Sequence, residues 1–232
     1  MSDEALLRDK TATMARILNL QGTIGMFGHI SIRMPGTSRV FISPGASTDK
    51  STVRPENIFI FDLDGTIVEH PGGLIPLEWR IHTQIHRDRP DAMCIAHLHA
   101  PHARALGVAG KELVPVFLHG SFLRDGVPTR NNPRLVVNDE QAADLSRALG
   151  DKMAVQMRGH GCVVVGETAE QTLFACTFLE ENAGIQLQAE ILGGAIPLTP
   201  DERAIAPRVH SIRGYFRCSG RTTSARCGST PE

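Results

Sequence analysis

Two histidines separated by one residue, His97 and His99, carry the clearest chemical signal in the sequence. They follow the apolar run 93–96 (MCIA), which is typical of a buried strand. Side chains two positions apart on a strand project from the same face. Both imidazoles can therefore bind the same small ligand. The ligand expected for such a pair of histidines is a divalent metal ion. The pair predicts a metal site whose other ligands come from elsewhere in the chain.

Two further residues have the chemistry to complete that site. His160 lies between two glycines in a predicted tight turn, where the backbone can bring an imidazole close to a site. Glu78 is predicted in the first turn of a helix, where the N-terminal peptide dipoles stabilise an anion. Three imidazoles and one carboxylate form a four-ligand set, in which the carboxylate can detach to act as acid or base. This set suits zinc, and manganese and cobalt accept it as well.

Other histidines have surroundings less typical of a metal site. His82 and His86 are spaced i, i+4 on the same predicted helix, but that helix is rich in charge, so both side chains are predicted to be solvated. His102 follows Pro101 and is either a fourth metal ligand or a residue that supports a ligand through a hydrogen bond, and the supporting role is favoured.

The pattern of apolar residues around these positions predicts a mixed α/β fold. Helical spacing predicts helices over residues 5–21, 76–89, 101–106, 140–149 and 168–192. Short apolar or alternating runs predict strands over residues 29–33, 40–42, 58–62, 66–68, 93–99, 114–117, 153–157 and 162–165. Because helices and strands interleave irregularly, a layered α/β fold is favoured over repeated βαβ units.

Residues 61–66 (FDLDGT) match the D-x-D-G-T signature of haloacid-dehalogenase-type phosphotransferases. In those enzymes a long loop and a helix follow the signature. Here the chain returns at once as the apolar run 66–68, and an Asp-Gly pair between two apolar runs is a strong hairpin signal. The segment is therefore predicted to be a hairpin.

Composition narrows the partners and the compartment. The 232 residues carry a formal net charge of -1, which gives no electrostatic reason to expect nucleic acid or a membrane surface as partner. No apolar run approaches the ~20 residues of a membrane span, and the first residues lack the pattern of a signal peptide. The five cysteines are widely spaced, which suits free thiols in a reducing compartment. A cytoplasmic protein is predicted.

Taken in order, six segments resemble the class II aldolase/adducin family over roughly residues 5–195. The segments are residues 28–33 (GHISIR), 43–45 (SPG), the hairpin 62–68, 78–80 (EWR), 97–99 (HLH) and 158–161 (RGHG). The resemblance implies a three-layer α/β/α sandwich around a mainly antiparallel sheet, and a homotetramer with active sites at subunit interfaces. It also implies His97, His99 and His160 as ligands of one divalent metal per subunit. Glu78 would be the catalytic acid or base and a further ligand of the resting metal.

Departures from the sugar-phosphate members of that family narrow the substrate. Where those members bind phosphate, this chain has Gly28-His29, Pro44-Gly45 and Pro76-Leu77, so hydroxyl donors before Glu78 are missing. The aldolases also use a tyrosine as proton donor, and the single tyrosine here is Tyr215. A phosphorylated sugar is therefore not expected.

The chain is more similar to the decarboxylase branch of the family, which acts on hydroxylated aromatic and pyridine dicarboxylates. Retro-aldol cleavage and this decarboxylation both break a C–C bond and leave negative charge that a divalent metal can stabilise. A metal-dependent decarboxylase is the expected function, and an aldolase acting on a small unphosphorylated substrate is the alternative. A non-catalytic adducin-like scaffold is less expected, because such domains lose the metal histidines that this chain retains.

Substrate contacts are expected on the strand over residues 29–33. His29, Ser31 and Arg33 share one face of it and are predicted to bind a second substrate carboxylate, with Arg80 as a weaker choice. Arg33 is equally well explained as a solvated charge at a strand end.

Residues 1–214 are predicted to form the catalytic domain, and residues 215–232 a disordered tail. After Tyr215 and Phe216 the tail contains only small, polar, charged and proline residues. Relatives often extend an aromatic tail to the neighbouring site, so a contribution of this tail to a neighbour is left open.

Overall fold

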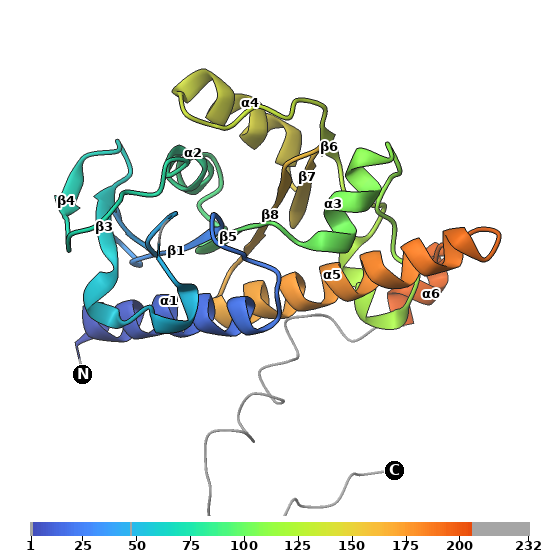
Figure 1. Ribbon diagram of the computed structural model, residues 1–232, viewed down its shortest axis with the longest axis horizontal. Coiled ribbons are helices and arrows are strands. Elements are labelled where there is room, and N and C mark those ends of the chain that lie inside the picture. Colours follow the sequence, from blue (N-terminus) through green and yellow to red (C-terminus); the bar gives the residue numbers. More distant parts are fainter. Residues whose placement is uncertain (1, 47, 206–232) are drawn as a thin grey trace, which may run out of the picture.

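The computed structural model describes residues 2–46 and 48–205, and these form one sheet covered by helices (Figure 1). The strands are β1 (His29–Arg33), β2 (Arg39–Ile42), β3 (Phe59–Asp62), β4 (Ile67–Glu69), β5 (Cys94–Leu98), β6 (Thr129–Arg130), β7 (Ala154–Met157) and β8 (Gly161–Gly166). The helices are α1 (Asp3–Leu20), α2 (Arg80–Asp88), α3 (Pro101–Val108), α4 (Asp139–Leu149), α5 (Ala169–Ile191) and α6 (Pro200–Ile205). Three short 3₁₀ helices are η1 (Lys50–Thr52), η2 (Pro55–Asn57) and η3 (Leu118–Leu123).

The sheet has the strand order β4-β3-β2-β1-β5-β8-β7-β6. Neighbouring strands pair antiparallel, apart from β6 and β7, which are parallel. The predicted mainly antiparallel sheet is confirmed. β5 lies near the middle, between β1 and β8.

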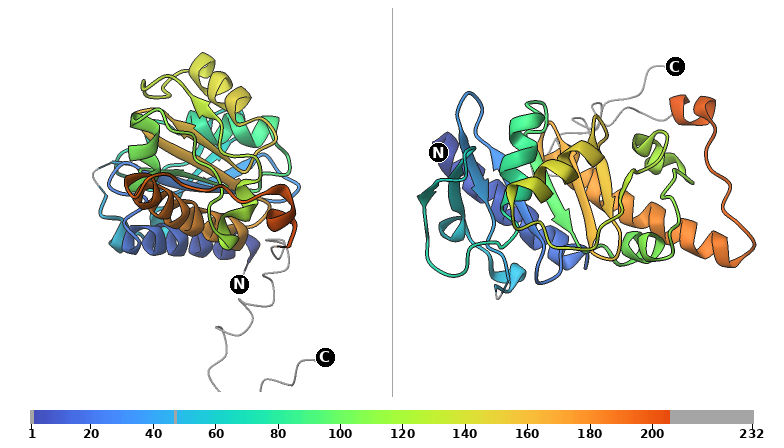
Figure 2. Two further views of the ribbon diagram at one scale, coloured as in Figure 1. Left: turned by 90° about the vertical axis from the view of Figure 1, so that its right-hand side faces the viewer. Right: turned by 90° about the horizontal axis from the view of Figure 1, so that it is seen from above.

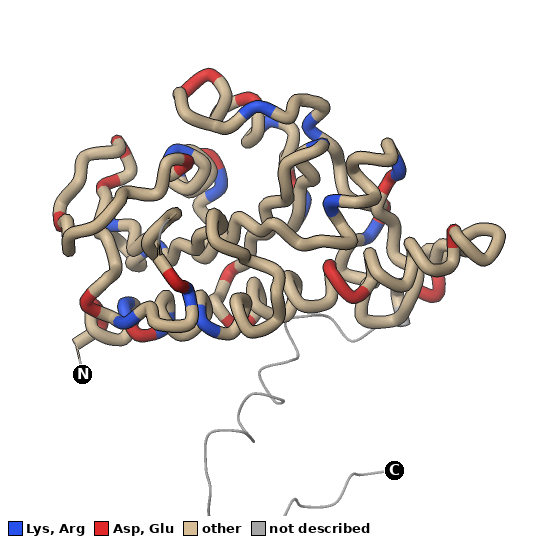
Figure 3. Tube along the Cα trace, viewed as in Figure 1, with Lys and Arg blue, Asp and Glu red and all other residues tan. Residues whose placement is uncertain are grey.

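Helices cover both faces of the sheet, as the end-on view shows (Figure 2, left). α1, α3 and α5 contribute to one apolar core, and α2 and α4 contribute to a second core on the opposite face. β5 contributes to both cores because successive side chains of a strand point to opposite faces of the sheet. Cys94 and Ala96 face the first core, and Ile95 faces the second. Charged residues of both signs are spread over the outer helices and loops (Figure 3). The layered α/β/α arrangement is as expected.

Several local predictions are confirmed. β3 and β4 form the hairpin predicted over residues 62–68, with the Asp62 amide donating to the Thr66 carbonyl at 2.8 Å. α5 begins after Thr168, whose hydroxyl accepts from the Gln171 amide. Cys94, Cys162 and Cys176 are buried free thiols. The remaining two cysteines, Tyr215 and the predicted tail 215–232 lie outside the described residues. Within the described part of the chain, no helix is long and apolar enough to cross a membrane.

The predicted strand over residues 114–117 is wrong, because side chains of α5 occupy the place of a partner strand. The Asn182 amide accepts from the Val116 N–H at 2.9 Å and donates to the Val114 carbonyl at 2.8 Å. Gln186 accepts from the Val114 N–H at 3.0 Å. These buried amides satisfy the backbone without a strand.

The predicted helix over residues 76–89 begins later, at Arg80. Residues 77–79 form a turn, closed by the Trp79 N–H donating to the Pro76 carbonyl at 3.2 Å. A Cβ on Gly45 would lie 2.6 Å from the Pro76 Cα, so this turn is packed tightly on the loop after β2. Glu78 therefore precedes the helix instead of lying in its first turn.

Gly65 in the β3–β4 hairpin should tolerate alanine poorly. Its φ of 93° is in the left-handed region, and a Cβ there would overlap the Trp79 ring. We expect Gly65→Ala to lower the free energy of unfolding in urea by about 1–3 kcal/mol. Gly72→Ala is the matched control, because Gly72 has a φ of 97° but open space around its Cα. Equal costs for the two variants would contradict the packing role of Gly65.

Candidate metal centre

Four side chains predicted to form the site meet at one end of β5. One nitrogen from each of His97, His99 and His160 lies within 4.8 Å of the others. His97 Nε2 is 3.1 Å from His99 Nε2. Glu78 Oε2 is 3.2 Å from His160 Nε2 and 3.5 Å from His97 Nε2.

The pairing of β5 with β8 brings these residues together. Leu98 on β5 is paired with Cys162 on β8, so His99 and His160 leave the sheet side by side. Gly161 permits the close approach, because a Cβ there would overlap the Leu98 carbonyl oxygen. Gly159 has a φ of 71°, which closes the turn between β7 and β8.

The four side chains fit a divalent metal ion. A tetrahedral site with metal–ligand bonds of about 2.0–2.2 Å holds its ligand atoms about 3.3–3.6 Å apart, and three pairs of ligand atoms here lie 3.1, 3.2 and 3.5 Å apart. The buried atoms His97 Nδ1, His160 Nδ1 and His160 Nε2 have no hydrogen-bond partner among the described residues. A buried polar atom without a partner costs about 1–3 kcal/mol, which a bound ion would relieve at His160 Nε2.

The surroundings of Glu78 and His99 favour the protonation states that metal binding requires. Burial alone would raise the pKa of Glu78, but the imidazoles of His160 and His97 hold that pKa well below its usual range. The other carboxylate oxygen of Glu78 accepts from the Val136 amide at 2.7 Å, which fixes the side chain. Burial, together with His97 and His160, lowers the pKa of His99 to about 3. An ionised carboxylate and a neutral imidazole are the metal-binding forms.

Of the three residues predicted to share a face of β1, only His29 lies at the cluster. It is paired with His97 across β1 and β5, and one of its nitrogens lies within 4.8 Å of ligand atoms of His97 and Glu78. Ser31 is placed under α2, where its hydroxyl is bonded to two imidazoles. Arg33 donates to the carbonyls of Thr37 and His86, both at 3.2 Å.

Arg80 lies at the start of α2. Its guanidinium stacks on the Trp79 ring, 4.3 Å from the ring centroid, and pairs with Asp139 at 3.1 Å. The Arg80 side chain remains 32% exposed, so a ligand approaching the surface can still contact it.

The prediction that His82 and His86 are solvated is wrong, because both are fully buried. Their i, i+4 spacing places them on the face of α2 that packs on β1, whose own polar residues are their partners. The charges that suggested solvation lie on the other faces of the helix. His102 does not support the cluster: its ring is paired with Glu180 at 2.8 Å.

Sequence reasoning missed Lys50, which has no distinguishing motif. Its side chain is 1% exposed, and its Nζ donates to the carbonyls of Pro44 and Gly45, each at 2.5 Å. Burial lowers the pKa of Lys50 to about 8. Lys50 thus fixes the loop that packs against Pro76, two residues before Glu78.

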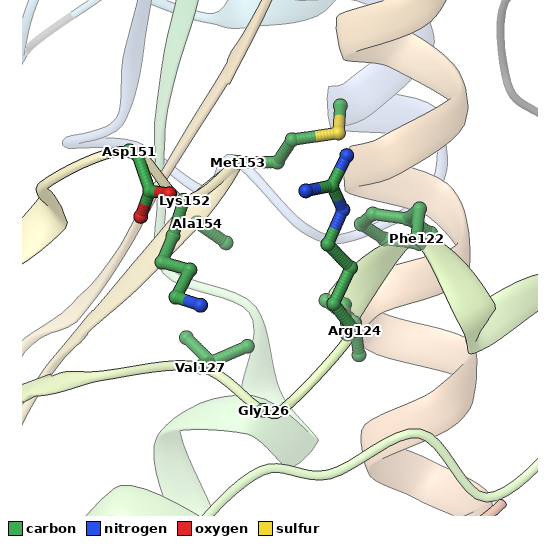
Figure 4. Close-up of a pocket in the computed structure, with 9 residues that line it drawn as sticks. Phe122, Arg124, Gly126, Val127, Asp151, Lys152, Met153 and Ala154 are labelled. Atoms are coloured by element: carbon green, nitrogen blue, oxygen red, sulfur yellow. The ribbon is translucent and has the colours of Figure 1, made fainter. Parts of the chain in front are cut away.

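A small cavity lies apart from these residues, between η3 and the start of β7 (Figure 4). Its volume of about 50 Å³ gives room for a few water molecules only. Arg124 and Lys152 line it, together with Phe122 and Met153, and none of the predicted site residues does. It is too small to hold an aromatic acid.

The fold and the donor set define an α/β protein with a candidate site for a divalent metal ion. Residues 9–187 match the family model described as the class II aldolase and adducin N-terminal domain. The chain belongs to this family.

Curated relatives include two enzymes named 3,4-dihydroxyphthalate decarboxylase. The one from Arthrobacter keyseri is 32% identical over 210 residues, covering 84% of this chain and 83% of that protein. The one from Rhodococcus jostii is 30% identical over 197 residues, covering 80% of this chain and 81% of that protein. Among solved structures, an L-fuculose 1-phosphate aldolase matches with a TM-score of 0.77 at 20% identity, covering 92% of this chain and 98% of that one. That likeness shows the fold.

Replacing His97 should remove the metal site. We expect His97→Ala to lose the divalent ion, about one per chain, because it deletes the imidazole that contacts both Glu78 and His99. Elemental analysis of purified protein measures this. His102→Ala is the control, since this histidine pairs with Glu180 outside the cluster. Unchanged metal content in His97→Ala would refute the assignment.

Replacing Lys50 should destabilise the loop before the site. Lys50→Met leaves two carbonyls without their donor, so we expect a loss of about 1–3 kcal/mol in the free energy of unfolding. Because the pKa of Lys50 falls from 10.5 to about 8 on folding, the unfolded chain binds more protons between these values. The wild type therefore gains stability over the variant as pH rises through that window. Urea unfolding at pH 7.5 and pH 10 measures the difference, and a constant or shrinking difference would contradict this.

Proposed function

We propose that the protein is a divalent-metal-dependent decarboxylase of a hydroxylated aromatic dicarboxylate such as 3,4-dihydroxyphthalate. The observation that carries the proposal is the cluster of His97, His99 and His160 around Glu78. This cluster occurs in a chain that is 32% and 30% identical to two enzymes named 3,4-dihydroxyphthalate decarboxylase, over about four-fifths of its length. A hydroxylated pyridine dicarboxylate has the same arrangement of groups and is the nearest other substrate.

His97, His99, His160 and Glu78 would hold one divalent ion, with zinc or manganese as the expected metal and cobalt as a further choice. When bound, the ion acts as a Lewis acid that stabilises negative charge on an oxygen next to the bond that breaks. The protein's part is to hold the ligand atoms close together, with three of the pairs 3.1–3.5 Å apart, and to bury the cluster.

The reaction breaks the bond between a ring carbon and its carboxylate. CO₂ leaves, the electron pair of that bond stays on the ring, and a proton is taken up at the ring carbon. Because Glu78 is ionised in the free protein, it would first take up a proton from water and then pass it to the ring carbon, directly or through a water that it holds. Its Oε1 is fixed by the Val136 amide, so the carboxylate is oriented before the substrate arrives.

Arg80 is the guanidinium proposed to bind the second carboxylate of the substrate. It lies two residues after Glu78 and is partly exposed. Its salt bridge with the exposed Asp139 lies at the surface, where such ion pairs are weak. Ser31 and Arg33 are less suited to this role because their polar atoms already have partners beneath α2.

We also propose a homotetramer in the cytoplasm, with subunits meeting near the metal cluster. Exposed apolar side chains surround the cluster: Phe27 stacks with His99, Leu77 precedes Glu78, and Leu135 and Val137 flank Val136. Apolar side chains gathered at one rim are typical of a surface covered by another molecule.

The proposed function is tested by CO₂ release from 3,4-dihydroxyphthalate by the metal-loaded protein. We expect Glu78→Gln to reduce kcat by about 10²–10⁴-fold, because the amide keeps the shape of the side chain but cannot deliver a proton. Glu180→Gln is the control, since Glu180 pairs with His102 away from the cluster. Formation of an aldehyde from small hydroxy-carbonyl compounds, with no CO₂ from any hydroxylated dicarboxylate, would favour the aldolase alternative and contradict the proposal.

A further inference from the structure

A line of buried polar groups leads from the metal cluster into the interior beneath α2. His29 Nδ1 is 2.6 Å from His82 Nε2, and His82 Nδ1 is 2.7 Å from Ser31 Oγ. Ser31 Oγ is also 2.8 Å from His86 Nε2, and His86 Nδ1 is 2.7 Å from the Ala92 carbonyl oxygen. The four side chains of this line are at most 1% exposed. It arises because the polar face of β1 packs on the i, i+4 face of α2.

The carbonyl of Ala92 determines which atom of each group carries the proton. A carbonyl only accepts, so His86 Nδ1 is the donor, and in a neutral imidazole His86 Nε2 must then accept. Ser31 has one hydroxyl proton and gives it to His86, so its oxygen accepts from His82 Nδ1. His82 Nε2 then accepts from His29 Nδ1.

The rings in this line are neutral, because they are at most 1% exposed and are hydrogen-bonded to one another, to Ser31 and to the Ala92 carbonyl, with no carboxylate among these bonded partners. Burial holds the pKa of His82 well below its usual range. Burial also lowers the pKa of His86 to about 3. With its one proton on Nδ1, His29 has a bare lone pair on Nε2.

That lone pair belongs to the side chain that lies beside the metal cluster. His29 is paired with His97 across the two central strands and lies close to Glu78. Because Nδ1 is bonded to His82, Nε2 is the nitrogen left to interact with a ligand. A lone pair attracts a hydrogen-bond donor and repels a carboxylate.

We propose that His29 is a specificity-determining residue that accepts, at Nε2, a hydrogen bond from a hydroxyl group of the substrate. His82, Ser31 and His86 are positioning residues that hold His29 in this tautomer. The inference rests on the proposed function, since it assigns a partner to the hydroxyl of a hydroxylated aromatic acid. It replaces the carboxylate-binding role that the sequence predicts for His29.

Neutron diffraction of the perdeuterated, metal-loaded protein tests the tautomer directly and requires no activity. We expect deuterium on Nδ1 of His29, His82 and His86, and none on His29 Nε2. Deuterium on His29 Nε2 overturns the proposal.

Ligand binding tests the role of the lone pair. The probes are 3,4-dihydroxybenzoate, which is 3,4-dihydroxyphthalate without the carboxylate next to the 3-hydroxyl, and its two monomethyl ethers. We expect the wild type to bind the dihydroxy acid roughly tenfold more tightly than one of the ethers. His29→Leu should abolish that preference while its metal content stays unchanged.

Variants of Ser31 test whether the hydrogen bonds of the line, and not only the packing of its side chains, hold His29 in its tautomer. Ser31→Ala breaks the line and should reduce the preference for the hydroxyl, whereas Ser31→Thr keeps the hydroxyl and should keep the preference. Ser146→Ala is the matched control, because its buried hydroxyl is bonded to Asp88 at 2.6 Å, outside the line. All three should retain their metal.

The outcomes are distinguishable. A preference that persists in His29→Leu, or a loss of metal in that variant with unchanged binding of the probes, overturns the role of His29. A metal-loaded wild type that binds none of the probes and releases no CO₂ overturns the proposed function and the hydroxyl partner with it. The tautomer of His29 is decided by the neutron map in either case.

Discussion

The site depends on the pairing of β5 with its two neighbours. β8 on one side places His160 beside His97 and His99, and β1 on the other side places His29 opposite His97. Because registers in an antiparallel sheet are fixed by the alternation of buried side chains, a slip of one residue would turn His97 into the opposite core. The apolar residues of β5 therefore determine where the candidate metal ligands lie.

The second constraint is the cost of burying polar groups. The face of the sheet beneath α2 contains His29, Ser31, His82 and His86, all fully buried, and each is acceptable there because it is hydrogen-bonded to the next. The metal cluster is the exception, since three of its buried nitrogens have no partner among the described residues. A line of hydrogen-bonded imidazoles thus lies beside a cluster in which several nitrogens are free to bind an ion, and His29 belongs to the line while it borders the cluster.

The family relationship and the geometry contribute different parts of the functional conclusion. The fold is shared with a sugar-phosphate aldolase at 20% identity, so it does not by itself select a reaction. The similarity to two decarboxylases selects the reaction class. The residues around the cluster bear on the substrate: Pro76 and Leu77 offer no hydroxyl before Glu78, and the Ser43 hydroxyl is occupied by the Ile30 amide. Both observations fit a substrate without a phosphate group.

The sequence by itself determined the strands around the site and the residues that cluster there, although it placed Glu78 inside a helix that begins only at Arg80. His97 and His99 are two positions apart at the end of a strand, and the glycines on either side of His160 predict its turn. Rules about residues close in sequence were therefore enough to predict these positions. Local rules failed where a partner distant in sequence decides the outcome. Asn182 and Gln186 replace a strand partner for residues 114–117.

Only the tertiary structure showed that the polar face of β1 packs on the helix that contains His82 and His86. The sequence predicted that His29, Ser31 and Arg33 share a face, which is correct, but it could not tell whether a substrate or a helix covers that face. Charges next to His86 suggested water around it, yet its burial depends on how α2 lies on the sheet. Which face of an element is buried is a property of the whole packed molecule, because the neighbours that exclude water come from other parts of the chain.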